Sequence, residues 1–252
     1  DVFRSVRDVL TDDGTLWVNI GDSYYNYRPG KGQALVKQTL SKTERDQPQT
    51  CARRGNKLEG LKEKDLIGIP WMLAFALRAD GWYLRQDIIW HKPNPMPESV
   101  RDRCTKSHEY LFLLSKNKKY YYNNEAIKEP VKQDWGTRDR TMGKYHNPGT
   151  GLAPHSGLSK SYDRKNKRSV WSITNKPYKG AHFAVFPPDL IEPCILAGSE
   201  QGDIILDPFM GSGTTGMVAK KHFRSYIGCE LHEDYASLQT DRIDSIPPQL
   251  VL

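Results

Sequence analysis

Apolar residues near the start of the chain recur first at helical spacing and then as a continuous strand. Four of the first ten residues share one face of a helix with 3.6 residues per turn: Val2, Phe3, Val6 and Leu10. Residues 12–14 (DDG) predict a turn, and residues 15–20 (TLWVNI) predict a buried strand. A helix, a turn and a strand in this order are typical of an α/β unit.

The middle of the chain alternates patterned segments with polar ones. The predicted elements here are a helix at 65–81 and strands at 82–90, 108–114 and 120–122. Asp65 can cap that helix and Gly81 can end it. Residues 28–64 are polar and lack a period, so they predict a long polar loop.

Regular structure returns in the last quarter of the chain. The predicted elements are a helix at 187–197, a strand at 203–206, a helix at 214–221, a strand at 225–229 and a helix at 233–243. Strands that alternate with helices indicate an α/β fold with parallel pairing. The length of 252 residues suits one such domain with a small insert.

Charge is concentrated in one segment. Residues 116–170 carry thirteen Lys and Arg against five Asp and Glu, whereas the whole chain has a net charge of +7. The remaining 197 residues therefore sum to −1. A basic segment on a near-neutral body favours a module that faces phosphates, although a solvated basic loop gives the same pattern.

The cysteines and the hydropathy exclude several other classes. Cys51, Cys104, Cys194 and Cys229 are scattered without a CxxC pair, which predicts reduced thiols in a cytoplasmic protein and no metal site. The chain has no run of about 18 apolar residues, so no membrane span is predicted.

The candidate chemistry lies at residues 204–216 (IILDPFMGSGTTG). A strand ends at Asp207, a glycine-rich turn lets a ligand approach the backbone, and a helix begins with its N–H groups facing that turn. Such a turn, at the carboxyl edge of a parallel sheet, holds nucleotide-like ligands. Glu230 ends the next strand, about 20 residues after the glycines, where an acid can accept bonds from ribose hydroxyls.

The residues around the turn limit the kind of ligand. No Lys-Ser/Thr pair follows the glycines, which disfavours a nucleoside triphosphate. Asp207 would repel a pyrophosphate but attract an amine, and S-adenosylmethionine carries an amine and an adenosine. The alternative is that Asp207 only caps the helix and that Phe209 is a core aromatic.

Several segments together resemble one enzyme family. Residues 207–215 resemble its cofactor motif I, residues 227–230 its motif II and residues 182–187 its motif X, while residues 14–24, 89–94 and 105–110 resemble its remaining strands. The chain thus resembles the DNA amino-methyltransferases that modify adenine N6 or cytosine N4, in their permuted β-type order. The resemblance implies an α/β, Rossmann-like, S-adenosylmethionine-dependent methyltransferase sheet. It assigns residues 1–115 and 171–252 to the core and residues 116–170 to a basic target-recognition insert.

The resemblance also assigns site residues. The implied S-adenosylmethionine-binding residues are His182, Phe183, Phe186, Asp207, Phe209, Gly211, Gly213, Thr214 and Glu230. A base pocket would include Asp22, Trp90 and Lys92, although a turn residue, a core tryptophan and a solvated lysine are equally good interpretations. The implied DNA-binding residues are Arg138, Arg140, Arg164, Lys165, Lys167 and Arg168. Double-stranded DNA is the implied partner, and a homodimer is compatible with the family.

One family feature is missing from this sequence. The catalytic tetrapeptide, Asp/Ser/Asn-Pro-Pro-Tyr/Phe, does not occur in the 252 residues. The resemblance places it, with central strands, ahead of residue 1, so we expect an N-terminal segment to be missing. It also predicts a gap beside the strand at 203–206, and a 252-residue chain that is unstable and inactive on its own.

The predicted function is site-specific transfer of a methyl group from S-adenosylmethionine to the exocyclic amine of adenine or cytosine, in a restriction-modification setting. The target base would be flipped out of the duplex and its amine would attack the methyl group directly. Two alternatives stay open here: a non-catalytic protein that binds DNA or cofactor, and an RNA methyltransferase.

Overall fold

The computed structural model describes residues 1–25, 60–131, 163–175 and 185–247. The helices are α1 (Val2–Val9), α2 (Ile69–Ala79), α3 (Pro188–Gly198), α4 (Thr214–Lys221) and α5 (Asp234–Asp244), with a 3-10 turn η1 (Glu125–Ile127). The strands are β1 (Thr15–Ile20), β2 (Tyr83–His91), β3 (His108–Ser115), β4 (Glu129–Pro130), β5 (Arg164–Lys165), β6 (Val170–Ser172), β7 (Ile204–Asp207) and β8 (Ser225–Gly228).

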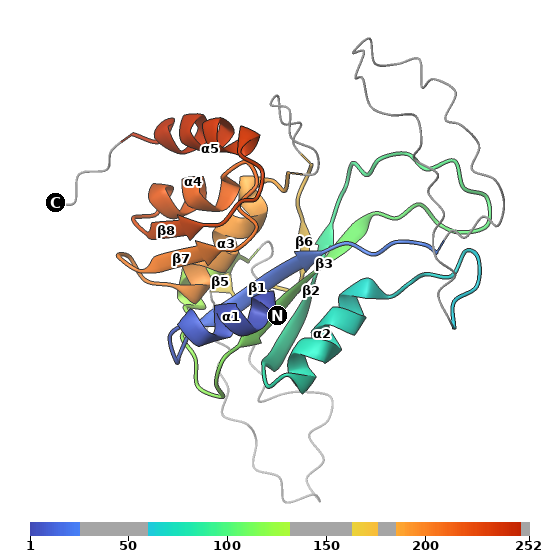
Figure 1. The fold of residues 1–252 in the computed structure, drawn as a ribbon, viewed down its shortest axis with the longest axis horizontal. Coiled ribbons are helices and arrows are strands. Elements are labelled where there is room, and N and C mark those ends of the chain that lie inside the picture. Colours follow the sequence, from blue (N-terminus) through green and yellow to red (C-terminus); the bar gives the residue numbers. More distant parts are fainter. Residues whose placement is uncertain (26–59, 132–162, 176–184, 248–252) are drawn as a thin grey trace, which may run out of the picture.

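A four-stranded mixed sheet forms the centre of the fold, in the order β1-β3-β2-β6 (Figure 1). Strand β3 runs antiparallel to both of its neighbours, and β6 runs parallel to β2. In the β1–β3 ladder Leu16 lies opposite Leu114, and Val18 lies opposite Phe112. Because side chains alternate along a strand, these four residues face the same side of the sheet.

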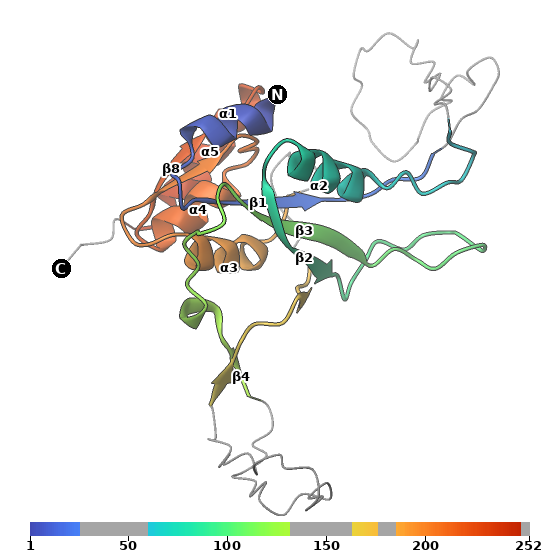
Figure 2. The same ribbon diagram turned by 90° about the horizontal axis from the view of Figure 1, so that it is seen from below.

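Helices cover both faces of this sheet (Figure 2). On one face α1 and α2 pack on β1 and β3, with Val6, Ala74 and Phe112 in the core. On the other face α3 packs on β2 and β6, with Leu190 and Trp171 in a second core. The three layers give a mixed α/β fold in which the carboxyl ends of β1, β2 and β6 lie at one edge.

Strands β7 and β8 form a separate parallel pair that is joined by α4. Within the described residues β7 makes no ladder with the four-stranded sheet. Packing joins the two parts instead, because Leu206 contacts the first core cluster and α3 packs on α4 through Ile195 and Val218.

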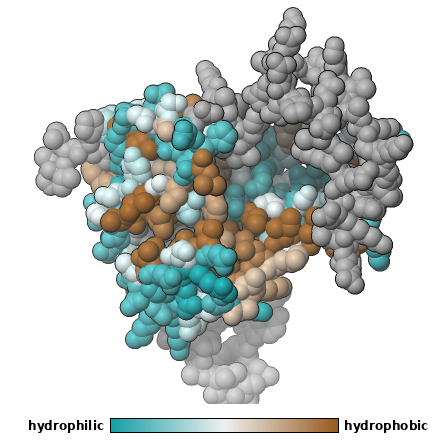
Figure 3. Space-filling view, viewed as in Figure 1, coloured by the Kyte–Doolittle hydropathy of each residue, from teal (hydrophilic) through white to brown (hydrophobic). Residues whose placement is uncertain are grey.

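Apolar surface flanks the unpaired side of β7. Figure 3 shows it on the face between the β7–β8 pair and α2. Exposed large apolar side chains in these elements are Ile204, Ile227, Met72 and Phe75.

Most predicted elements are confirmed, with two corrections. The predicted cap Asp65 does not bind the start of α2; its carboxylate accepts the Lys62 N–H, while Asp22 accepts the N–H groups of Gly68 and Ile69. Residues 120–122 form no strand. Their tyrosines pack instead, since Tyr122 stacks on Trp17 with ring centroids 6.4 Å apart.

The described cysteines are reduced. Cys104, Cys194 and Cys229 are free thiols, whereas Cys51 lies outside the described residues. Burial raises the pKa of the Cys194 thiol, so this side chain stays protonated and acts as a small apolar group in the core. No described helix is long and apolar enough to cross a membrane, and the described residues contain no cluster of potential metal ligands.

Candidate cofactor-binding site

Asp207 ends β7 and shapes the turn that follows it. Its Oδ1 accepts the Phe209 N–H at 2.9 Å, and its Oδ2 accepts the Thr215 hydroxyl at 2.5 Å. The carboxylate therefore ties the turn to the Thr215 side chain in the first turn of α4, and not to a backbone N–H of that helix as a capping residue would. An ionised carboxylate offers about four lone-pair sites, so these two bonds leave capacity for a ligand amine.

Glu230 reaches the same turn from the neighbouring strand. Its Oε2 accepts the Gly211 N–H at 2.8 Å, and its Oε1 accepts the His232 N–H at 2.9 Å. A backbone bond from the Met210 N–H to the Cys229 carbonyl, at 2.9 Å, holds the turn beside the end of β8. The two predicted acids thus meet on one glycine-rich turn, at the carboxyl edge of adjacent parallel strands.

The glycines of the turn are required by its backbone. Gly211 and Gly213 have φ angles of +52° and +81°, in the left-handed region that side chains disfavour. A Cβ atom on Gly213 would also lie 3.1 Å from the Gln239 Cα of α5. Glycine is therefore the residue that this turn accommodates with least strain at both positions.

Phe209 and Thr214, both predicted to bind cofactor, have different environments. The Phe209 side chain is 64% exposed and touches Phe3 edge-on, with ring centroids 6.5 Å apart. It is not a core aromatic, so its ring is available to a ligand. Thr214 is only 3% exposed, as the first residue of α4.

The other predicted cofactor residues lie in or beside the segment at 182–187. Phe186 packs against the second core cluster, beside the start of α3. His182 and Phe183 lie outside the described residues. Their role stays a prediction.

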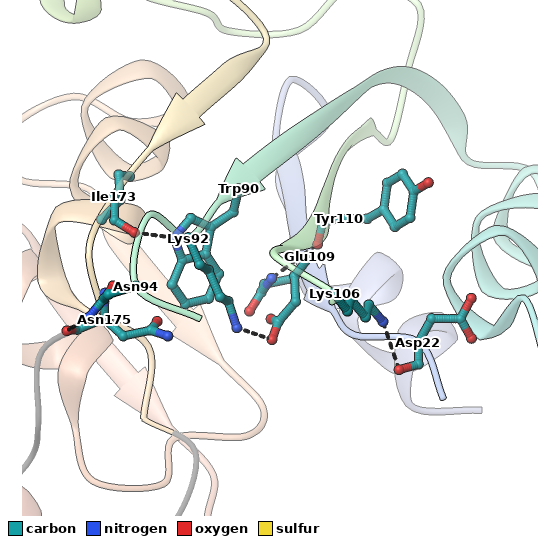
Figure 4. Close-up of polar contacts among 10 residues, drawn as sticks. Asp22, Trp90, Lys92, Asn94, Lys106, Glu109, Tyr110, Ile173 and Asn175 are labelled. Carbon is teal, nitrogen blue, oxygen red and sulfur yellow. Dashed lines mark hydrogen bonds and ion pairs between the residues drawn. The ribbon is translucent and has the colours of Figure 1, made fainter. Parts of the chain in front are cut away.

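A second polar group lies where β2 ends and β3 begins (Figure 4). Lys92 forms an ion pair with Glu109, and its Nζ lies 4.2 Å from the centroid of the Trp90 ring. Trp90 is 3% exposed and donates to the Ile173 carbonyl at 2.9 Å. Its burial favours the core interpretation, whereas Lys92 and Glu109 are the partly exposed members of the group.

Asp22 lies at the same edge but has a structural task. Its Oδ1 accepts the N–H groups of Gly68 at 3.0 Å and Ile69 at 3.1 Å, which satisfies donors at the start of α2. Its backbone carbonyl accepts the Lys106 ammonium at 2.8 Å (Figure 4). These bonds are the ones a turn residue makes, and a role of Asp22 in a base pocket stays a prediction.

Part of the predicted DNA-binding set lies at the base of the basic insert. Arg164 and Lys165 form β5, which pairs with β4 in a ribbon that projects from the body (Figure 2). Arg168 and Lys167 both pair with Glu129, at 3.1 and 4.0 Å. Glu129 thus offsets part of the local positive charge. Arg138 and Arg140 lie outside the described residues.

Sequence reasoning missed four residues of these groups: Thr215, Glu109, Gln239 and Arg242. Thr215 follows the glycines and Glu109 interrupts an apolar strand, so both gave a local signal. Gln239 and Arg242 are spaced i, i+3 on α5, and polar residues on one helical face normally indicate only solvent exposure. Their contact with the turn depends on tertiary packing, which the spacing does not reveal.

Comparison with known proteins identifies the family. A family model described as DNA methylase matches residues 1–241. The chain is 51% identical over 243 residues to the type II methyltransferase M.SmaI of Serratia marcescens, covering 96% of this chain and 72% of that protein. It is 46% identical over 242 residues to M.Cfr9I of Citrobacter freundii, covering 96% and 69%.

Solved structures share the fold. The PvuII DNA methyltransferase, titled cytosine-N4-specific, matches with a TM-score of 0.61 and 17% identity, over 98% of this chain and 70% of that one. A Thermus thermophilus protein solved with S-adenosyl-L-methionine, titled a DNA modification methylase, matches with a TM-score of 0.57 and 21% identity, over 97% and 74%. At these identities the likeness shows the fold alone.

The chain therefore belongs to the N6/N4 DNA methylase family, and it is an S-adenosylmethionine-dependent DNA methyltransferase. The non-catalytic and RNA-directed alternatives are not supported. The expectation that this chain is inactive is not borne out, because the relatives that it matches over 96% of its length are named as methyltransferases.

Removing either acid tests the site directly. We expect Asp207→Ala and Glu230→Ala each to weaken S-adenosylmethionine binding roughly tenfold or more, because each removes a charged hydrogen-bond acceptor. Isothermal titration calorimetry measures the dissociation constant. Glu200→Ala, which removes an exposed acid from the turn before β7, should leave affinity unchanged. Unaltered affinity in both Asp207→Ala and Glu230→Ala would defeat the site assignment.

Proposed function

We propose that the glycine-rich turn between β7 and α4 holds S-adenosylmethionine, and that the enzyme methylates the exocyclic amine of adenine or cytosine at specific sites in double-stranded DNA. The observation that carries this proposal is the meeting of Asp207 and Glu230 on one turn, through the Phe209 and Gly211 amides. The two carboxylate acceptors and the exposed Phe209 ring suit a ligand with an amine, ribose hydroxyls and an aromatic base.

Each residue of the turn has a distinct task in this proposal. Glu230 accepts hydrogen bonds from the ribose hydroxyls of S-adenosylmethionine, and Asp207 attracts its amino group. The exposed Phe209 ring packs on its adenine. When bound, S-adenosylmethionine supplies the activated methyl group. The protein contributes mainly by holding the donor in one orientation, since positioning and fixed charges account for most of the rate gain in such transfers.

The target base would approach at the edge where β1, β2 and β3 present their polar ends. There the Lys92–Glu109 pair is partly exposed, with side-chain exposures of 17% and 26%. We propose that this pair lines the base pocket, while Trp90 supports it from the core. No Pro-Pro-Tyr-type tetrapeptide occurs in the printed sequence, so no residue of this chain is assigned to hold the reacting amine.

The β4–β5 ribbon and the basic residues beside it would face the phosphates. Arg164 and Arg168 are exposed, as phosphate contacts require. Lys167 is better suited to a structural role, because it lies over the Trp171 ring at 4.9 Å. Lys165 belongs to the same proposed surface, and Arg138 and Arg140, which lie outside the described residues, stay predicted DNA-binding residues. A cytoplasmic location and a homodimer remain proposals that accompany this function.

Methyl transfer from labelled cofactor tests the function. We expect the protein to label unmethylated double-stranded DNA, and mass spectrometry of the hydrolysed nucleosides should identify N6-methyladenine or N4-methylcytosine. RNA of matched sequence should accept little label. DNA from a host that expresses the enzyme should also accept little, because its target sites are already methylated. Labelling of RNA in preference to DNA, or of cytosine C5, would contradict the proposal.

Breaking the Lys92–Glu109 pair tests the base pocket. We expect Lys92→Met to lower kcat/KM for DNA roughly tenfold, because a charged contact near the substrate is lost and Glu109 is left unpaired. The dissociation constant for S-adenosylmethionine should stay unchanged.

Lys116→Met is the matched control for this variant. Lys116 is also a partly buried lysine, with 21% side-chain exposure, and it pairs with Asp12 at 3.3 Å. A loss of activity in Lys116→Met as large as that in Lys92→Met would show a general effect on folding and would overturn the assignment.

A further inference from the structure

Helix α5 packs on the back of the glycine-rich turn and contacts it at two points. The Gln239 Nε2 donates to the Gly211 carbonyl at 2.8 Å. One helical turn later, Arg242 Nη1 donates to the Ser212 hydroxyl at 2.8 Å. Since i, i+3 residues share a helical face, one side of α5 is matched to two successive residues of the turn.

The contact is close as well as polar. A Cβ atom on Gly213 would lie 3.1 Å from the Gln239 Cα and 3.3 Å from its Cβ. Ser212 is 2% exposed beneath this helix, so its hydroxyl is bonded within the protein and not to water. The turn therefore cannot shift toward α5, and it cannot shift away without breaking both bonds.

Helix α5 is itself anchored to the fold. Ile243 of α5 is 5% exposed and packs closely against Gly216 of α4. A Cβ atom on Gly216 would lie only 3.0 Å from the Ile243 Cδ1. The Lys220 ammonium on α4 donates to the Ile243 carbonyl at 3.1 Å. The two residues that hold the turn thus project from a helix whose C-terminal end is fixed.

Both backbone polar groups of Gly211 are therefore hydrogen-bonded. Its N–H donates to Glu230, and its carbonyl accepts from Gln239. Any rotation of the peptide on either side of Gly211 would break one of these bonds. The direction of the Glu230 carboxylate therefore depends on the peptide geometry that α5 maintains.

We propose that Gln239 and Arg242 are positioning residues for the cofactor, which set the shape of the turn without binding the cofactor themselves. The inference rests on the proposed cofactor site. Loss of either side chain is then expected to weaken cofactor binding without weakening DNA binding. Helix α5 thus contributes to affinity for the methyl donor as well as to folding.

The test compares variants that keep or lose each donor. Gln239→Glu keeps the shape of the side chain but removes the N–H donor, and Arg242→Met removes the guanidinium, whereas Arg242→Lys keeps a donor. We expect the first two to raise the dissociation constant for S-adenosylhomocysteine roughly threefold to tenfold, the effect of one lost hydrogen bond. Arg242→Lys should recover most of the affinity. Asp241→Ala, on the exposed side of the same helix, should change nothing.

Kinetics separate positioning from a general loss of structure. In Gln239→Glu the KM for S-adenosylmethionine should rise by the same factor, while kcat and the KM for DNA stay near those of the wild type. Equal changes in both KM values, or unchanged cofactor affinity with a lowered unfolding temperature, would overturn the inference.

The same titrations distinguish failure of this inference from failure of the site. If Asp207→Ala and Glu230→Ala weaken binding but Gln239→Glu and Arg242→Met do not, only the role of α5 is wrong. If none of the four variants weakens binding, the cofactor site itself is wrong and this inference falls with it.

Discussion

The bond between the Gly211 amide and the Glu230 carboxylate is the contact on which the rest of the site depends. It joins the turn after β7 to the end of β8, at 2.8 Å, and so places two acids from different strands on one loop. Asp207 completes the arrangement from the other end, through Phe209 and Thr215. The left-handed backbone at Gly211 and Gly213 makes this geometry accessible.

The surrounding fold keeps these atoms in register. Parallel pairing of β7 with β8 sets Asp207 opposite Gly228, which brings both carboxyl ends to one edge. Helices α4 and α5 then close on the turn from behind. The four-stranded sheet contributes the second edge, where Lys92 and Glu109 lie. Among the described residues no ladder joins the two sheets. Side-chain packing through α3 and Leu206 holds them together instead.

The sequence was sufficient to predict the site where its chemistry is local. Asp207, the glycines and Glu230 lie at strand ends, so periodicity and spacing placed them, and the structure brings them together. The antiparallel direction of β3 and the capping of α2 by Asp22 could not be predicted in this way. The capping bond joins residues 46 positions apart, and the direction of β3 is set by its ladders with β1 and β2. The role of Gln239 was missed because its contact with the Gly211 carbonyl, 28 positions away, depends on how α5 packs on the turn.

A crystal structure of the protein with S-adenosylmethionine would show whether the two carboxylates hold the methyl donor. We expect ribose hydroxyls hydrogen-bonded to Glu230, the amino group near Asp207, and a Gly211 amide still bonded to Glu230. A cofactor bound elsewhere, or one that contacts neither carboxylate, would contradict this expectation.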